Sequence, residues 1–103
     1  MNHQEQAQIA NTIFQQLGGN RFVVMTGARS VSREGATLIV KLPTPAGLRA
    51  FGFNVTLNPM DLYNVTFVRL TRAWDVQRNT IENIYADQLK SIIETETGLR
   101  LSL

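Results

Sequence analysis

The chain has 103 residues, of which 44% are hydrophobic and 17% are charged, and its formal net charge is +2 at pH 7. These values predict one globular domain over residues 1–103 and exclude an intrinsically disordered chain, which would be poorer in aliphatic residues. The chain has no cysteine and a single histidine, His3. This excludes a disulfide framework, a catalytic thiolate and a histidine metal site, so we expect no cofactor and no metal.

The first predicted element is an amphipathic helix over residues 3–17. Its apolar side chains recur at helical spacing, and glutamines fill the positions between them. These apolar residues are Ile9, Ala10, Ile13, Phe14 and Leu17.

Gly18 and Gly19 follow this helix and have two interpretations. They could cap its C-terminus, because glycine adopts the left-handed conformation at low steric cost. They could instead cradle a phosphate, but a phosphate loop places glycines between a strand and a helix. Here a helix precedes them, the segment RFVVM (residues 21–25) is predicted to be a strand, and the GxxxxGK[ST] spacing is absent. The capping interpretation is therefore favoured.

The middle of the chain predicts three further strands. The polar segment TGARSVSREG (residues 26–35) is interpreted as a long basic loop, and ATLIVKLP (residues 36–43) as the second strand. LRAFGFNVTL (residues 48–57) alternates Phe51, Phe53 and Val55 on one face with Gly52 and Asn54 on the other, which predicts the third strand.

NPMD (residues 58–61) predicts a turn, and LYNVTFVRLTRAW (residues 62–74) predicts the fourth strand. The apolar residues of this fourth strand change parity, so we expect a β-bulge near Phe67 and Val68.

The C-terminal part predicts a second helix between Thr80 as N-cap and Gly98 as C-cap. The order helix, four strands, helix indicates an α+β fold with a four-stranded, mainly antiparallel sheet and both helices over one face. The expected core residues are Ile9, Ile13, Phe14, Leu17, Leu38, Val40, Phe51, Phe53, Val55, Ile84, Leu89 and Ile92.

The charges are distributed unevenly between these elements. Residues 21–78 contain eight basic and three acidic residues, whereas the predicted helices are mostly acidic. If the helices cover one face of the sheet, the other face and its loops form a basic surface that can bind an anionic partner.

Nucleic acid is the leading candidate partner, with arginines on phosphates and an exposed aromatic residue stacking on bases. Tyr63 and Trp74 are the aromatic residues we expect to be exposed. Two other interpretations remain: the basic residues solvate the sheet and protect its edges, or they bind an acidic protein surface. The candidate nucleic-acid-binding residues are Arg29, Arg33, Lys41, Arg49, Arg69, Arg72 and Trp74.

An enzymatic function is not predicted, so no catalytic residue is assigned. His3 lies near the N-terminus, where a catalytic base would be poorly held, and Glu94 and Glu96 face different ways. The N-terminus lacks the pattern of a signal peptide and no apolar run approaches the roughly 20 residues that span a bilayer, so we expect a cytoplasmic protein without a membrane partner.

Three segments resemble a group of short uncharacterised proteins found in phage, prophage and other mobile elements. They are IANTIFQQLGGNRFVVMTGAR, with its LGGNRFxxMTGA-type motif, LNPMDLYNVTF and YADQLKSIIETETGL. The resemblance implies a common fold and carries over no catalytic or ligand residue. It implies either an accessory nucleic-acid binder or a protein that binds and blocks a host factor.

The last residues suggest self-association. Leu99, Leu101 and Leu103 alternate after Gly98, and such a tail either frays in solvent or pairs with a second copy to form a homodimer. A homodimer would suit the protein-binding alternative.

Overall fold

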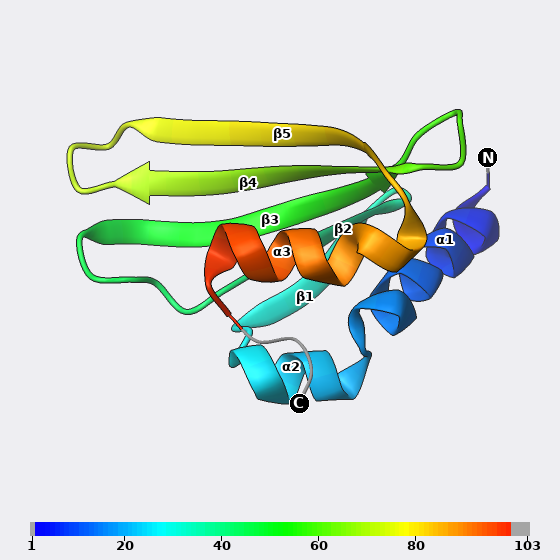
Figure 1. Cartoon of the computed structure of the whole chain (residues 1–103), viewed down its shortest axis with the longest axis horizontal. Helices are drawn as coiled ribbons and strands as arrows, with labels where there is room; N and C mark the ends of the chain where they lie inside the picture. The colour runs from blue at the N-terminus through cyan, green and yellow to red at the C-terminus, as the bar shows by residue number, and fades with distance from the viewer. Residues whose placement is uncertain (1, 100–103) are drawn as a thin grey trace.

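The computed structural model describes residues 2–99. It has a five-stranded antiparallel sheet with helices against one face (Figure 1). The strands lie in chain order, so each pairs with its neighbours in sequence. They are β1 Ser30–Glu34, β2 Thr37–Lys41, β3 Leu48–Leu57, β4 Tyr63–Thr71 and β5 Val76–Ile84. The helices are α1 His3–Leu17, α2 Asn20–Thr26 and α3 Leu89–Thr97, the last preceded by the 3-10 turn η1 Ala86–Gln88. The predicted α+β class is confirmed, and residues 2–99 contain five strands and three α-helices in place of the four and two predicted.

Helix α1 has the predicted bounds. The Asn2 side chain caps its start by accepting a hydrogen bond from the Glu5 backbone N–H at 2.8 Å. Gly18 ends the helix with φ of 118°, and its N–H donates to the Gln15 carbonyl. The capping interpretation of Gly18 is thus confirmed.

Residues 21–25 were predicted to be a strand, and this is wrong: they lie in helix α2. Phe22 and Thr26, four residues apart, are both buried, while Val24 between them is 80% exposed. This spacing is typical of a helix, because in a strand all three residues would lie on one face. Gly27 ends the helix in the left-handed conformation. The glycine pair therefore connects two helices, and no strand precedes it as a phosphate loop would require.

The predicted long basic loop is also wrong, because it contains β1. This strand forms a tight hairpin with β2, and Gly35 takes a positive φ of 60° in the turn. Four of its five residues are exposed. An edge strand with so little burial gives no apolar alternation in the sequence.

Strand β4 has no bulge at Phe67 and Val68. Its pairing with β3 is continuous there, and the register shifts lie elsewhere, near Leu48 in β3 and near Tyr63 in the pairing with β5. Tyr63, Val65 and Phe67 therefore face the helices.

The second helix was predicted to begin at Thr80, but residues 76–84 form β5. Thr80 is not an N-cap: its hydroxyl lies 2.9 Å from the hydroxyl of Thr66 across the β4–β5 pair. The predicted end of the helix is confirmed, because Gly98 caps α3 with φ of 73°.

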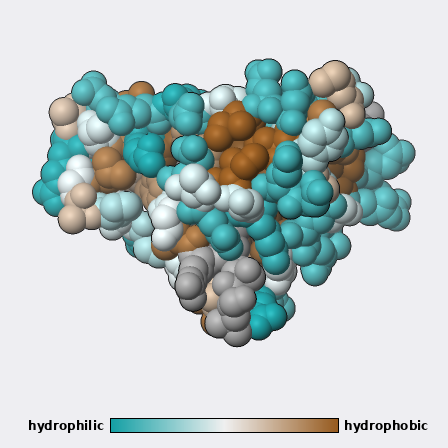
Figure 2. Space-filling model, viewed as in Figure 1, coloured by the Kyte–Doolittle hydropathy of each residue, from teal (hydrophilic) through white to brown (hydrophobic). Residues whose placement is uncertain are grey.

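The core lies between the sheet and the helices. The Phe53 ring is 6.2 Å from that of Phe22 in α2 and 6.0 Å from that of Phe67 in β4, between ring centroids. Most of the expected core residues are buried, whereas Ile9, Phe14 and Ile92 are only partly buried. The expected core set lacked Ala10, Leu42, Tyr63, Val65 and Ile93, which are also buried, whereas Phe22 and Phe67 are buried as their aromatic side chains led us to expect. Figure 2 shows apolar surface on the helix side beside α3, so the helices leave part of this face uncovered.

Candidate functional site

Most basic residues of the sheet gather at one of its two ends. Because all neighbours are antiparallel, the starts of β1, β3 and β5 meet the ends of β2 and β4 (Figure 1). We call this the basic end, and it holds Arg29, Lys41, Arg49, Arg69, Arg72 and Arg78. We call the other the turn end, and it holds Arg33 together with Glu34, Asp61 and Glu82. Within residues 28–84, Asp75 is the one carboxylate at the basic end.

Most sheet residues that are basic gather near one end of the strands, so charge differs mainly along the strands. Not every basic residue at this end faces away from the helices. Arg69 is an example: it pairs with Phe51 in the register and its guanidinium lies 5.2 Å from the Phe51 ring centroid, on the side of the helices.

One row of residues crosses the open face, the face without helices, near the basic end. In register, Lys41 of β2 lies opposite Gly52 of β3, Gly52 opposite Val68 of β4, and Val68 opposite Arg78 of β5. Neighbouring strands are about 4.8 Å apart, so the backbones of Lys41 and Arg78 are separated by about 14 Å. Two cations thus flank a floor of small and apolar side chains.

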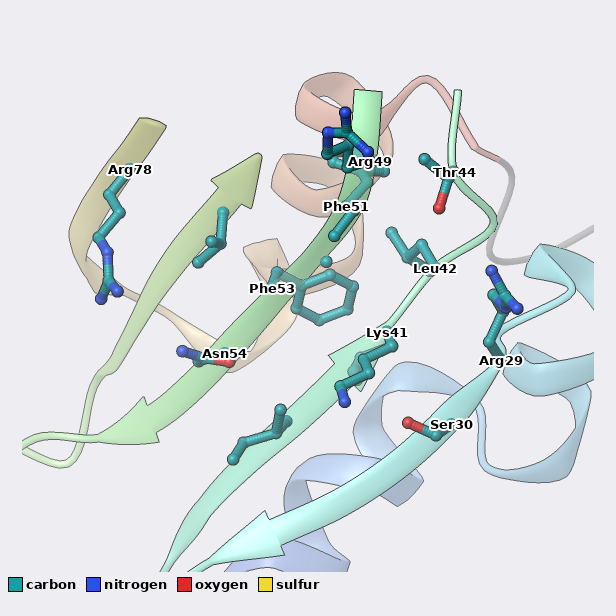
Figure 3. A pocket seen from close by; sticks show the side chains of 15 residues that line it. Arg29, Ser30, Lys41, Leu42, Thr44, Arg49, Phe51, Phe53, Asn54 and Arg78 are labelled. Carbon is teal, nitrogen blue, oxygen red and sulfur yellow. The ribbon is translucent and has the colours of Figure 1, made fainter. Parts of the chain in front are cut away.

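A shallow groove of about 620 Å³ follows this row (Figure 3). Ile39, Ala50 and Val68 are among the apolar residues that line it, and none of its lining residues is a carboxylate. Its four cationic side chains are Arg29, Lys41, Arg49 and Arg78. Figure 3 shows Arg78 at one margin and Arg29 at the other, with β2 and β3 between them.

Gly52 keeps the floor of the groove low. A Cβ atom at this position would collide with the backbone carbonyl oxygen of Val40 on β2, so another residue would force the strands to move. The fold thus requires glycine at the centre of the row, because the β2 backbone takes the place of a side chain.

Trp74 lies beside the groove in a strained conformation. It sits in the β4–β5 turn with φ of 67°, a region that bulky residues rarely adopt, and 67% of its surface is exposed. The Arg49 guanidinium lies 4.0 Å from the Trp74 ring centroid, and its Nε donates to the Arg72 carbonyl at 3.3 Å. A strained and exposed tryptophan adds nothing to the core.

The groove cations have no counter-ion among residues 2–99. Within residues 2–99, no carboxylate forms an ion pair with Arg29, Lys41, Arg49 or Arg78. Four uncompensated positive charges around one hollow create a potential that attracts an anion.

The structure unites only part of the predicted site. Arg29, Lys41 and Arg49 line the groove, and Arg72 and Trp74 lie in the adjoining turn. Arg33 lies at the opposite end.

Arg33 donates a hydrogen bond from Nη1 to the Gly35 carbonyl at 3.0 Å. Arg69 faces the helices, as described above, and Tyr63 is only 5% exposed, so it is not available for stacking.

Arg78 is the groove residue that the sequence prediction missed. Once the segment is recognised as β5, the hairpin register places Arg78 opposite Val68 and on the same face as Lys41. The polar alternation of VQRNTI was the available signal, but the helical spacing of the following isoleucines obscured it.

A second hollow of about 450 Å³ lies between α1 and the turn end of the sheet. It is lined by Glu5, Gln8, Ile9, Thr12, Leu57 and Tyr63, so it has one carboxylate and no cation. Burial raises the pKa of the Tyr63 phenol, and a hydrogen bond with the Gln16 side chain opposes this shift. This hollow lacks the groups that an anionic ligand needs.

Comparisons with known proteins give no family for the chain: no protein-family model, no curated protein and no solved structure matches it. Residues 2–99 contain no group of three or more metal-ligating side chains. Within the same residues, no helix is both long and apolar enough to cross a membrane.

Proposed function

We propose that the protein is a small non-enzymatic nucleic-acid binder that holds a single-stranded segment in the groove at the basic end of the sheet. The observation that supports this most is the groove itself: its lining holds four cations and no carboxylate, and within residues 2–99 none of the four forms an ion pair. Phosphates are the anions that such a spread of lysine and arginine side chains binds best.

Trp74 favours single strands over a duplex. A base stacks on a tryptophan only when its face is free, which is the condition in a single strand and not inside a helix. The Arg49 guanidinium already covers one face of the Trp74 ring, and the residue remains 67% exposed. One unstacked base beside the turn and phosphates along the row from Lys41 to Arg78 would occupy the site together.

The binding of labelled oligonucleotides, measured by fluorescence anisotropy at low salt, tests this proposal. We expect micromolar binding of single-stranded DNA or RNA and weaker binding of the duplex. In the double variant Lys41→Gln/Arg78→Gln the Kd should rise by about tenfold or more, because two phosphate contacts are lost.

The matched control is Arg33→Gln/Lys90→Gln, which removes the same charge away from the groove. Its Kd should stay near that of the wild type. Equal weakening in both double variants, or no binding to any oligonucleotide at micromolar protein, would contradict the proposal. Polyglutamate that binds as tightly as single-stranded DNA would favour an acidic protein surface as the partner.

A further inference from the structure

We propose that two copies of the chain pair through strand β5 and form one continuous ten-stranded sheet. β5 is the last strand of the sheet, with β4 on one side only. It has nine residues and contains no proline, whereas the opposite edge strand β1 has five. A long unprotected edge offers unpaired backbone groups to another strand.

The hairpin geometry decides which residues of β5 offer those groups. The Thr71 N–H donates to the Asp75 carbonyl at 2.9 Å, so Asp75 faces β4. Backbone direction alternates along a strand, so Gln77, Asn79 and Ile81 also face β4. Val76, Arg78, Thr80 and Glu82 therefore present their N–H and C=O groups to the free edge.

The charges select one register for an antiparallel pair. If the two-fold axis passes through Thr80, Arg78 lies directly opposite Glu82 of the partner subunit, and the symmetry forms this ion pair twice. An axis through Asn79 places Arg78 opposite a threonine, and an axis through Arg78 opposes two arginines. Opposite charges across a strand pair stabilise it and like charges destabilise it, so the axis through Thr80 is favoured.

Exposed apolar side chains flank the same edge. Among residues 2–99, three of the five exposed large hydrophobic residues lie at the ends of β5: Trp74 at 67%, Val76 at 54% and Tyr85 at 58% exposure. Ile84 points into its own core, and the register shift of β5 lies between Ile81 and Ile84, so regular pairing ends near Val76 of one copy and Tyr85 of the partner subunit. Pairing therefore brings exposed apolar side chains together at both ends of the two strands.

The two-fold axis stands perpendicular to the sheet, so both helix layers lie on one side and both open faces on the other. The two grooves would share one surface. Arg78 serves in both proposals, because its guanidinium contacts a phosphate in one and Glu82 of the partner subunit in the other. Dimer formation is therefore measured without nucleic acid, and either proposal can fail without the other.

Charge reversal provides the test, with nuclease-treated full-length protein in sedimentation equilibrium across the micromolar range. The wild type should dimerise. Arg78→Glu and Glu82→Arg each place like charges opposite one another twice, so each should raise the dimer Kd by at least about tenfold. The double variant Arg78→Glu/Glu82→Arg exchanges the charges and should restore the dimer. Circular dichroism verifies that each variant is folded.

Hydrogen exchange in the same samples tests the register. The amides of Arg78, Thr80 and Glu82 should be protected in the dimer and exchange fast in Glu82→Arg, while that of Asn79, which faces β4, stays protected in both. A monomeric wild type, single variants that dimerise as tightly as the wild type, or a double variant that stays monomeric would overturn the proposal.

Discussion

At the turn end of the sheet the polar side chains bind one another, whereas at the basic end the groove cations have no counter-ion within residues 2–99. Asn58 donates from Nδ2 to Asn64 Oδ1 at 3.0 Å and to Asn83 Oδ1 at 2.9 Å. The Asn58 Oδ1 atom accepts the backbone N–H groups of Met60 and Leu62 at 2.9 and 3.2 Å.

Polar groups that satisfy each other hold a fold together but have little left to offer a ligand. Charges without counter-ions do not stabilise the fold by ion pairing and remain available for binding. We therefore expect substitutions at the turn end to change stability, and substitutions at the basic end to change the proposed binding of nucleic acid.

The largest expected effect comes from the core that both ends share. Phe53→Ala should lower the free energy of unfolding by about 3–5 kcal/mol, because Phe53 is 1% exposed and packs against two other rings. Urea unfolding measures it. An unchanged midpoint would show that Phe53 is not at the centre of the core.

Asn58→Ala should destabilise the turn end and leave the basic end unchanged. We expect a loss of about 1–3 kcal/mol in the free energy of unfolding, because the loop amides and two asparagine side chains lose their partner. Affinity for single-stranded DNA should not change in the folded variant. A weaker affinity would mean that the two ends of the sheet are coupled, and would contradict the separation of stability and binding between them.

Trp74→Gly should give opposite effects on stability and on binding. Glycine adopts the positive φ of this position without strain, so the free energy of unfolding should stay constant or rise by up to about 1 kcal/mol. The binding free energy should weaken by about 1–3 kcal/mol through the lost base stack. Thermal unfolding and anisotropy give the two values, and a destabilised variant with unchanged affinity would place Trp74 in a structural role.

The smallest effect concerns Tyr63 at alkaline pH. Burial raises its pKa above the ordinary value of 10.0. The unfolded chain then loses the phenol proton at a lower pH than the folded protein. The contribution of the protonated Tyr63 phenol to stability is therefore complete below pH 10.0 and is lost as the pH rises through the folded-state pKa. Tyr63→Phe should flatten the decline of stability in that range. An equal decline in the variant would assign it to other groups.

The sequence predicted the elements whose own residues carry the signal. Helix α1 and strand β3 were predicted with the observed bounds, because each has one buried and one exposed face and a clear end. Strands β1 and β5 were missed because they are edge strands, held by hydrogen bonds to a neighbour more than by burial. Ile81, Ile84 and Leu89 match a helical spacing although β5 ends at Ile84.

The candidate site was predictable by residue type but not by position. Arg29, Lys41 and Arg49 were selected as basic residues of strands and loops, and they do line one groove. Their convergence with Arg78 depends on the strand order and register, which local pattern does not contain. Arg69 was included because the expected bulge in β4 would have turned it away from the helices. The bulge is absent, so the register turns Arg69 toward them.

The salt dependence of single-stranded DNA binding tests most directly whether the basic end holds phosphates. With the four groove cations on phosphates, the slope of log K against log salt concentration should be about −2.8, at roughly −0.7 per contact. In Lys41→Gln/Arg78→Gln it should fall to about −1.4, and in Asn58→Ala it should not change. A slope near zero, or the same slope in the wild type and in the groove variant, would contradict the account.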